Sequence, residues 1–298
     1  VQIDPWRIPL DDEKVLSSFA ARDTTGIFQF GSPGLKRLCE QLGRAKGGKL
    51  TFADLAVLNT LHRPAMLNIG LHTEYVYRVA GRRPVSYEHP VQERLLKDTF
   101  GIAMYQEQIM MICRELGGLS WAHVGDIRKI ISKREGFEAF QKARDLFVGG
   151  AVKNGCDLAV AERIFNTISH AGSYSFNKSH AMGYAMLAYW QMWLKVHYPL
   201  EYHTAILQCE RDEGYRSEYI RSARHSGIKF LTPDINRSEI GFCIDNDAIR
   251  IGLGGIEGVG PGAAKAAIAK RPYIDITDFA LKVERKIVNS RVIDHLIR

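Results

Sequence analysis

The sequence predicts a mainly α-helical protein with one small β-hairpin element. Apolar residues recur at helical spacing through most of the first two thirds of the chain, in stretches that begin near Ser, Thr or Asp and end near Gly or Pro. The alternation typical of strands occurs instead around Asn246 and Asp247. Apolar residues make up 46% of the 298 residues and charged residues 24%, the composition of an ordinary globular protein large enough for two domains.

Caps and periodicity predict helices along the first two thirds of the chain. Residues 32–45 begin with Ser32 as N-cap, followed by a proline in the first helical position and leucines at helical spacing. Residues 51–63 begin at Thr51 and are ended by the next proline. Further helices are predicted over residues 105–119, where two glycines stop the helix, over 120–134, beyond residue 137, and over 157–171.

The last third of the chain has a different character. One long helix is predicted from Ser179 to about Leu207, bent where Pro199 interrupts it. Residues 224–239 are rich in turn-forming residues around a short strand, and residues 241–256 alternate as in a β-hairpin. We therefore place a domain boundary between about residues 210 and 235.

Composition excludes several classes of protein. No apolar run is long enough for a membrane span, and the first residues lack the basic and apolar regions of a signal peptide. The five cysteines lie far apart without a CxxC pair, which argues against a zinc site and disulfide bonds and favours a reducing, cytoplasmic location. Lys and Arg number 40 against 33 Asp and Glu, and the net charge of +7 is compatible with a polyanionic partner. Because the chain begins with Val1 rather than Met, a piece of a longer protein is one interpretation.

A polar cluster directly precedes the aromatic-rich helix. Its members are Asn177, Lys178, Ser179 and His180, at a predicted helix start where backbone N–H groups and the helix dipole favour an anion. Such a set of groups could bind phosphate oxygens. The alternative is that Asn177 or Ser179 only caps the helix, with Lys178 in water. Spacing alone favours capping, because helix caps are far more common than anion sites.

A second candidate is the basic segment of residues 127–134. Lys129 and Lys133 lie one helical turn apart on one face, with Arg128 and Arg134 beside them. Like charges in this arrangement repel, so that an acidic partner such as a phosphate would stabilise the helix. A solvated basic face is an equally good interpretation of the same pattern.

A third candidate lies within residues 255–270. Gly258, Gly260 and Gly262 surround Val259 in a predicted tight turn, which leads into an Ala-rich helix containing Lys265. Glycines let the backbone approach a phosphodiester closely, and the helix N-terminus adds donors. A dinucleotide-binding loop would need a strand-helix-strand unit and a later acidic residue, which the sequence lacks. With a second basic helix downstream, the pattern favours a helix-hairpin-helix DNA-binding unit.

Several motifs occur together in the order of one known family. The chain contains "IPLDDEKV", "TTGIFQF", "HRPAMLNIG", "FGIAMYQEQIM", "GDIRKIISKR", "FNKSHAMGYAMLAYWQMWLKVHYPLEY", "TPDIN" and "GLGGIEGVG". On these motifs it resembles the fingers region of the catalytic alpha subunit of bacterial replicative DNA polymerase III, a C-family polymerase, along nearly its whole length. The resemblance implies a connector from an absent palm over residues 1–30, a helical fingers domain over 31–210, a linker and β-hairpin over 211–254, and a truncated helix-hairpin-helix DNA-binding region over 255–298.

The resemblance also implies roles for individual residues. It implies that the incoming deoxynucleoside triphosphate is bound by Arg128, Lys129, Lys133, Arg134, Tyr174, Asn177, Lys178, Ser179 and His180. It implies DNA contacts by Arg63, Gly258, Val259, Gly260, Gly262 and Lys265. The aromatic helix behind the polar cluster would be the packing that fixes the cluster in place.

Catalytic metal ligands are not expected in this chain. The family holds Mg²⁺ through three aspartates of the palm, which is N-terminal to this region. Asp4, in an Asp-Pro step, is predicted to lie in a turn, and Asp11 and Asp12 are predicted to cap a helix. The chain alone is therefore expected to be inactive and to need Mg²⁺ and the palm-containing remainder of the polymerase.

The resemblance implies further partners and leaves one alternative function. The partners are primer-template DNA, the sliding clamp and the clamp loader, with no membrane. In the alternative, the chain is a stand-alone, non-catalytic DNA-binding protein derived from a polymerase fingers and helix-hairpin-helix region. The retained polar cluster of residues 177–180 favours the polymerase, because a DNA-binding protein alone has no need of a nucleotide pocket.

Overall fold

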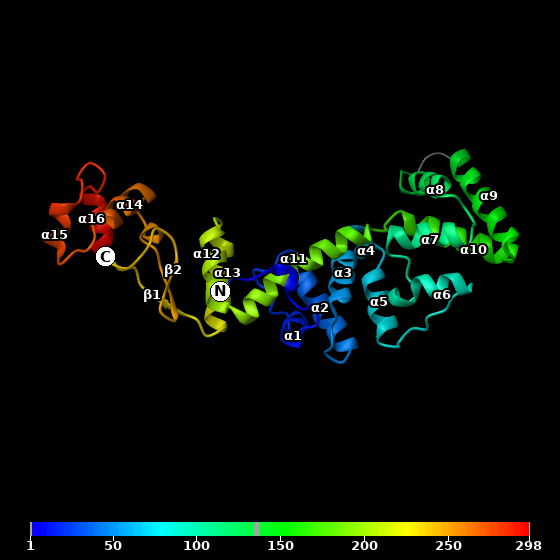
Figure 1. Cartoon of the computed structure of the whole chain (residues 1–298), viewed down its shortest axis with the longest axis horizontal. Coiled ribbons are helices and arrows are strands. Elements are labelled where there is room, and N and C mark those ends of the chain that lie inside the picture. The colour runs from blue at the N-terminus through cyan, green and yellow to red at the C-terminus, as the bar shows by residue number, and fades with distance from the viewer. Residues whose placement is uncertain (1, 134–136, 298) are drawn as a thin grey trace. The chain divides into compact units, whose positions relative to one another are not determined.

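The computed structural model describes residues 2–133 and 137–297, and it forms two compact units, Val1–Trp190 and Gln191–Arg298 (Figure 1). Among the described residues helices predominate, and the strands form one small sheet, which confirms the predicted fold class. The division at Trp190 falls inside the segment 31–210 that the resemblance assigns to the fingers.

The first unit is built from helices whose starts are set by local caps. Ser32 accepts a hydrogen bond from the backbone N–H of Leu35, and Thr51 forms a capping box with Asp54, as the sequence predicts. Gly118 has a φ of +64°, a conformation that glycine adopts at low cost after a helix end. The helices of this unit are α1 (Glu13–Ala20), α2 (Pro33–Ala45), α3 (Phe52–Leu61), α4 (Pro64–Asn68), α5 (Leu71–Val79), α6 (Pro90–Leu96), α7 (Gln106–Glu115), α8 (Trp121–Lys133), α9 (Phe137–Lys153), α10 (Leu158–Gly172) and most of α11 (Lys178–His197), with short 3-10 turns at Pro5–Arg7 and Lys97–Thr99.

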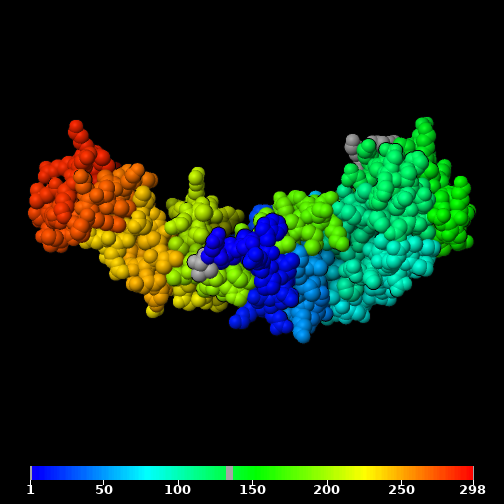
Figure 2. All heavy atoms as spheres, viewed as in Figure 1, coloured from blue at the N-terminus to red at the C-terminus, as the bar shows by residue number. Residues whose placement is uncertain are grey.

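Helices α6 to α10 pack around one apolar core. Ile112, Phe147, Ile164, Phe165 and Ile168 are fully buried in it. Figure 2 shows these cyan and green segments closely packed against one another. This core fixes α7, α8 and α10, the elements that carry or adjoin the predicted nucleotide-binding residues.

The prediction of one bent helix from Ser179 to about Leu207 is wrong, because the helix is interrupted. The structure has two helices, α11 (Lys178–His197) and α12 (Pro199–Cys209), separated at Tyr198 with φ −135° and ψ 57°. Proline disfavours the helical conformation in the residue before it and has no N–H to donate, so Tyr198 leaves the helical conformation and α11 ends at His197. The apolar periodicity continues through the break and gives no sign of it.

An aromatic side chain of α11 anchors the start of the chain. Tyr189 is fully buried, and its hydroxyl donates to the carbonyl of Pro9 at 2.8 Å and accepts from the N–H of Asp12 at 3.1 Å. The Trp6 and Trp190 rings meet edge to face, with centroids 5.0 Å apart. This part of α11 therefore acts as packing, as the sequence predicts for its aromatic residues.

The second unit contains α12, α13 (Glu213–His225), a three-stranded sheet and a C-terminal helical region. Strands β2 (Cys243–Asp245) and β3 (Ala248–Arg250) are antiparallel, and Asn246 between them has a φ of +56°, which confirms the predicted hairpin. Strand β1 (Lys229–Leu231) pairs in parallel with β3, giving the order β1-β3-β2. Helices α14 (Pro261–Ala269), α15 (Ile276–Lys282) and α16 (Ser290–Ile297) enclose a separate apolar core that includes Ala264, Val259 and Val288.

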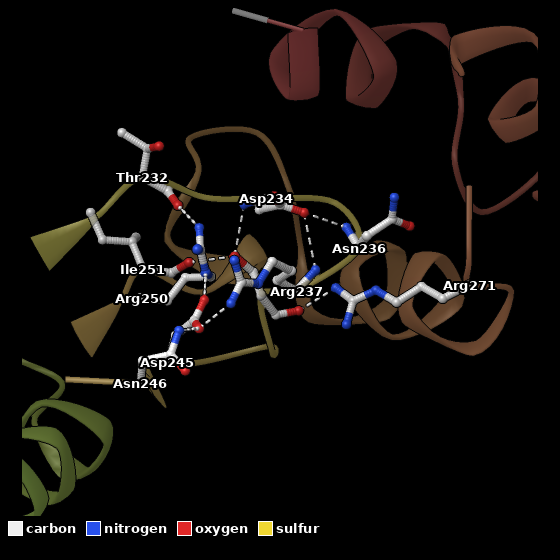
Figure 3. A network of polar contacts seen from close by, with 10 residues as sticks. Thr232, Asp234, Asn236, Arg237, Asp245, Asn246, Arg250, Ile251 and Arg271 are labelled. Carbon is white, nitrogen blue, oxygen red and sulfur yellow. Dashed lines mark hydrogen bonds and ion pairs between the residues drawn. The ribbon is translucent and has the colours of Figure 1, made fainter. Parts of the chain in front are cut away.

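A polar network connects the sheet with the helices of this region (Figure 3). The buried guanidinium of Arg250 donates to the carboxylate of Asp245 at 2.6 Å and to the carbonyl of Thr232 at 2.7 Å. Arg271, which follows α14, donates to the carbonyl of Ile235 at 2.6 Å. Both carbonyls belong to the "TPDIN" segment, so this loop holds the sheet and the last helices in one arrangement. A buried charge paired in this way costs much free energy if one partner is removed.

We predict a contrast between two adjacent glycines of α9. A Cβ at Gly150 would lie 1.9 Å from the carbonyl oxygen of Gly117, whereas a Cβ at Gly149 would meet nothing within 4 Å. Gly150→Ala should lower the free energy of unfolding by about 2 kcal/mol or more, because backbone must move. Gly149→Ala should raise it by about 0.5–1 kcal/mol, because alanine favours the helix. Denaturant unfolding of both variants measures the difference. Equal stability would contradict the close approach of α9 to Gly117.

Candidate functional site

The start of α7 and the start of α11 lie side by side through backbone pairing (Figure 1). Tyr105 and Phe176 form an isolated parallel bridge: the N–H of Phe176 donates to the carbonyl of Met104 at 2.9 Å, and the N–H of Gln106 donates to the carbonyl of Phe176 at 2.9 Å. Both backbone groups of Phe176 are thereby satisfied. The bridge places the polar cluster of residues 177–180 directly beside the first turn of α7.

Two side chains cap the first turn of α11. The Asn177 amide oxygen accepts the N–H of His180 at 2.7 Å, so the capping interpretation of Asn177 is confirmed. The Glu107 carboxylate accepts the N–H of Lys178 at 2.9 and 3.1 Å and the Asn177 amide N–H at 3.0 Å. Because these backbone donors are taken, a phosphate approaching this turn would meet side chains rather than the N–H groups of residues 178 and 180.

The side chains of this turn lie near aromatic rings. The Lys178 ammonium lies 5.7 Å from the centroid of the Tyr105 ring, within the range of a cation–π contact. Burial raises the pKa of Tyr105 to about 12, which keeps its phenol neutral. The His180 ring lies 5.2 Å from the ring of Phe176 and 4.0 Å from that of Tyr184. Asn177, Lys178, Ser179 and His180 are all exposed.

Arg63, which the resemblance assigns to DNA, lies in this same region. Its guanidinium stacks over the Phe176 ring at 3.9 Å from the centroid. Arg63, Phe176 and His180 line one cavity of about 290 Å³. Its other lining residues are Gln29, Asn59, His62, Ala181 and Tyr184. Burial, and to a smaller extent the neighbouring His72, lowers the pKa of His62 and favours its neutral form.

The basic helix α8 contributes Arg128 to the neighbourhood. Its guanidinium donates to the side-chain oxygen of Gln106 at 3.2 Å. Gln106 directly precedes Glu107, which caps α11. Lys129 is exposed and lies 3.9 Å from the Asp126 carboxylate, which fits a solvated face. The side chain of Lys133 and all of Arg134 fall outside the described part of the structure.

Tyr174 is more buried than the other members of the predicted nucleotide set whose side chains the structure describes. It is half-buried and packs against the core of α7 to α10. Burial raises the pKa of its hydroxyl. The Tyr174 side chain therefore supports the turn before α11.

The predicted DNA-binding hairpin precedes α14. Gly258 has a φ of +80°, and a Cβ there would come 2.5 Å from the His295 ring, so only glycine fits. The Val259 side chain is buried in the local core. At Gly260 and Gly262 a Cβ would meet nothing within 4 Å, and Lys265 is exposed. The hairpin therefore exposes the backbone of Gly260 and Gly262 and the ammonium of Lys265 to solvent.

Among the residues of this region that the sequence predictions did not single out are Gln106, Glu107 and Phe176. The signal for the first two is present in "YQEQ", where three polar residues follow one another at a helix start. Only the fold shows that Gln106 contacts a segment about 20 residues away and that Glu107 contacts one about 70 residues away.

Neither metal-binding nor membrane-spanning features are found in the described residues. No group of three or more His, Cys, Asp or Glu side chains is placed to hold a metal ion. Asp4, predicted to lie in a turn, caps the first 3-10 turn, and of the two aspartates predicted to cap a helix, Asp12 is the N-cap of α1. Within the same residues, no helix combines the length and apolarity needed to cross a bilayer.

Two family matches define the class of this chain, a polymerase finger domain and a helix-hairpin-helix motif. Residues 1–155 match the family described as the bacterial DNA polymerase III alpha subunit finger domain, and residues 227–298 match the helix-hairpin-helix motif. The chain belongs to the bacterial DNA polymerase III alpha subunit finger domain family.

Named relatives extend the similarity over the whole chain. The DNA polymerase III subunit alpha of Aquifex aeolicus is 34% identical over 303 residues, covering 100% of this chain and 26% of the relative. The subunits of Thermus aquaticus and Bacillus subtilis are 35% and 34% identical, again over 100% of this chain and over 25% and 26% of their own lengths. The chain thus spans about a quarter of the length of these relatives.

Proposed function

We propose that this chain is the fingers portion of a replicative DNA polymerase and binds the incoming deoxynucleoside triphosphate and the template. The observation that supports this most strongly is the gathering of Arg63, Arg128, Lys178 and His180 around the bridge between Tyr105 and Phe176. These four side chains come from three separate segments, since Lys178 and His180 both belong to α11, and they offer guanidinium, ammonium and imidazole groups. Such groups suit a polyanionic ligand with several phosphates.

In this proposal the chain binds and orients the nucleotide, and chemistry takes place elsewhere. Phosphoryl transfer depends mainly on positioning and on electrostatic stabilisation of the phosphate oxygens. Arg128 would make bidentate contacts through its planar guanidinium, and Lys178 would add a point charge. Lys129, Lys133 and Arg134 would support them, and Tyr174, Asn177 and Ser179 would complete the site.

The remaining parts of the reaction would come from other parts of the polymerase. Because the described residues offer no metal-ligand cluster, the Mg²⁺ ligands are assigned to the palm-containing remainder. The hairpin at Gly258–Gly262, with Lys265, would contact the DNA backbone without reading its sequence. The sliding clamp and the clamp loader are proposed as partners of the complete polymerase, whose reaction takes place in the cytoplasm.

We predict that Lys178→Ala, made in a complete polymerase containing this region, will impair use of the nucleotide more than binding of primer-template. Loss of a charge-assisted contact costs about 1.5–3 kcal/mol, or roughly ten- to hundredfold in kcat/KM. The backbone bond from residue 178 to Glu107 is untouched by this change. His180→Ala should have a smaller effect, because a neutral imidazole offers one hydrogen bond and no full charge.

Steady-state extension against nucleotide concentration, beside thermal melts, measures both effects. Lys153→Ala, at an exposed position at the end of α9, is the matched control. A lowered melting temperature with unchanged kinetics for Lys178→Ala would mean that its side chain is structural and that the phosphate assignment is wrong.

We also predict that the 298-residue chain alone will not extend a primer with Mg²⁺ and all four nucleotides, because it lacks a group of carboxylates for the metal ions among its described residues. Addition of a palm-containing partner should allow extension, whereas a stand-alone DNA-binding protein would gain nothing from it. Extension by highly purified chain that Asp4→Ala abolishes would contradict the assignment of Asp4 as a cap.

A further prediction concerns duplex DNA. We expect salt-sensitive, sequence-independent binding that is on the order of micromolar or weaker at physiological salt, because few phosphates are contacted. Gly260→Asp combined with Lys265→Glu should remove most binding at low salt. Both positions are exposed, and Gly260 has room for a side chain and tolerates Asp as an N-cap, so folding should be kept.

Arg211→Glu, an exposed charge reversal outside the hairpin, is the control for the charge reversal at Lys265. Fluorescence anisotropy with a labelled duplex over a salt series gives the affinities. If the double variant binds as tightly as the unchanged chain at low salt, the hairpin is not the DNA site.

A further inference from the structure

We propose that Gln106 and Glu107 are the positioning residues of the nucleotide site, an inference that rests on the proposed function. These two consecutive residues at the start of α7 hold the two basic groups proposed to meet the triphosphate. Gln106 contacts Arg128 of α8, and Glu107 contacts the first turn of α11, to which Lys178 belongs.

Glu107 fixes the start of α11 through three hydrogen bonds. Its carboxylate accepts the Lys178 N–H with both oxygens, at 2.9 and 3.1 Å, and the Asn177 side-chain amide at 3.0 Å. A carboxylate in this place is also stabilised by the positive end of the helix dipole. Asn177 in turn accepts the His180 N–H, so one carboxylate orders the backbone of the whole first turn.

Gln106 performs the matching task for α8. Its side-chain oxygen accepts from the Arg128 guanidinium at 3.2 Å, and its own backbone N–H donates to the Phe176 carbonyl at 2.9 Å. The contact to Arg128 is one hydrogen bond to a single guanidinium nitrogen.

The two positioning residues are themselves held firmly. Gln108 is the next residue along the chain. Its side chain accepts the backbone N–H groups of Met104 and Tyr105 at 3.1 and 3.0 Å and donates to the Thr99 hydroxyl at 2.8 Å. Tyr105 is buried. The start of α7 is thus a fixed point from which both basic groups are supported.

The consequence for binding is a fixed spacing. Because Gln106 and Glu107 are covalent neighbours, their Cα atoms are about 3.8 Å apart whatever the rest of the chain does. The backbone positions that carry the anchors of Arg128 and of the Lys178 turn therefore move together. Recognition of a triphosphate by several groups at once depends on such spacing, and displacement by about 1 Å can cost a large factor in rate.

The test uses Glu107→Ala and Glu107→Gln in a complete polymerase containing this region. Glu107→Ala should raise the nucleotide KM about tenfold, since a charge-assisted anchor is lost, with the Kd for primer-template unchanged. Glu107→Gln should raise KM less, because its amide oxygen still accepts the Lys178 N–H. Gln106→Ala should raise KM by a smaller factor as well. Glu115→Ala is the matched control, because it removes an ion-paired carboxylate from the other end of α7.

A second measurement is independent of activity. In the 298-residue chain, amide hydrogen exchange at Lys178 should become faster in Glu107→Ala and stay nearly unchanged in Glu115→Ala, with the buried amides of α10 protected in both. Faster exchange together with the raised KM is the expected result. Unchanged exchange at Lys178 would overturn the contact itself.

The outcomes separate this inference from the proposed function. If Lys178→Ala raises the nucleotide KM and Glu107→Ala does not, the positioning role is overturned and the nucleotide site stands. If neither variant changes KM, both proposals are overturned. If Glu107→Gln and Glu107→Ala weaken primer-template binding instead of nucleotide use, the start of α7 belongs to the DNA surface and the inference is wrong.

Discussion

The backbone pairing of Phe176 with residues 104–106 is the interaction on which the rest of the candidate site depends. It joins two segments about 70 residues apart and satisfies both backbone groups of Phe176. Once it is made, the Phe176 ring supports Arg63, and the next residues along each segment meet as Glu107 and Lys178. A short bridge suffices here because the apolar core of α7 to α10 already brings the two segments together.

The sequence predicted those features whose physical cause lies within a few residues. Ser32 and Thr51 cap their helices through N–H groups three positions ahead, and Asn246 turns the hairpin through its own backbone conformation. For the same reason Asp4 could be interpreted as a turn residue and Asp12 as a helix cap, rather than as metal ligands. Apolar periodicity then gave the fold class, since it reports which faces must be buried.

What the sequence could not show depends on contacts between distant segments. Nothing local to Arg63 indicates that it stacks on Phe176, and nothing local to Glu107 indicates that it caps a helix beginning 71 residues later. Val259 was grouped with its glycine neighbours by position, although its side chain packs into the core. The break at Tyr198 is a different case: the cause, Pro199, is local, but continuous periodicity on both sides outweighed it.

The polar cluster at the start of α11 shows how a helix cap and an anion site can share the same residues. From the sequence the two interpretations compete, because each needs groups at the helix N-terminus. In the structure they use different atoms. Capping occupies the backbone N–H groups of residues 178 and 180, through Glu107 and Asn177, and leaves the ammonium and imidazole of those residues exposed. Capping therefore does not exclude a phosphate-binding role; it supplies the rigid turn from which the charged side chains would act.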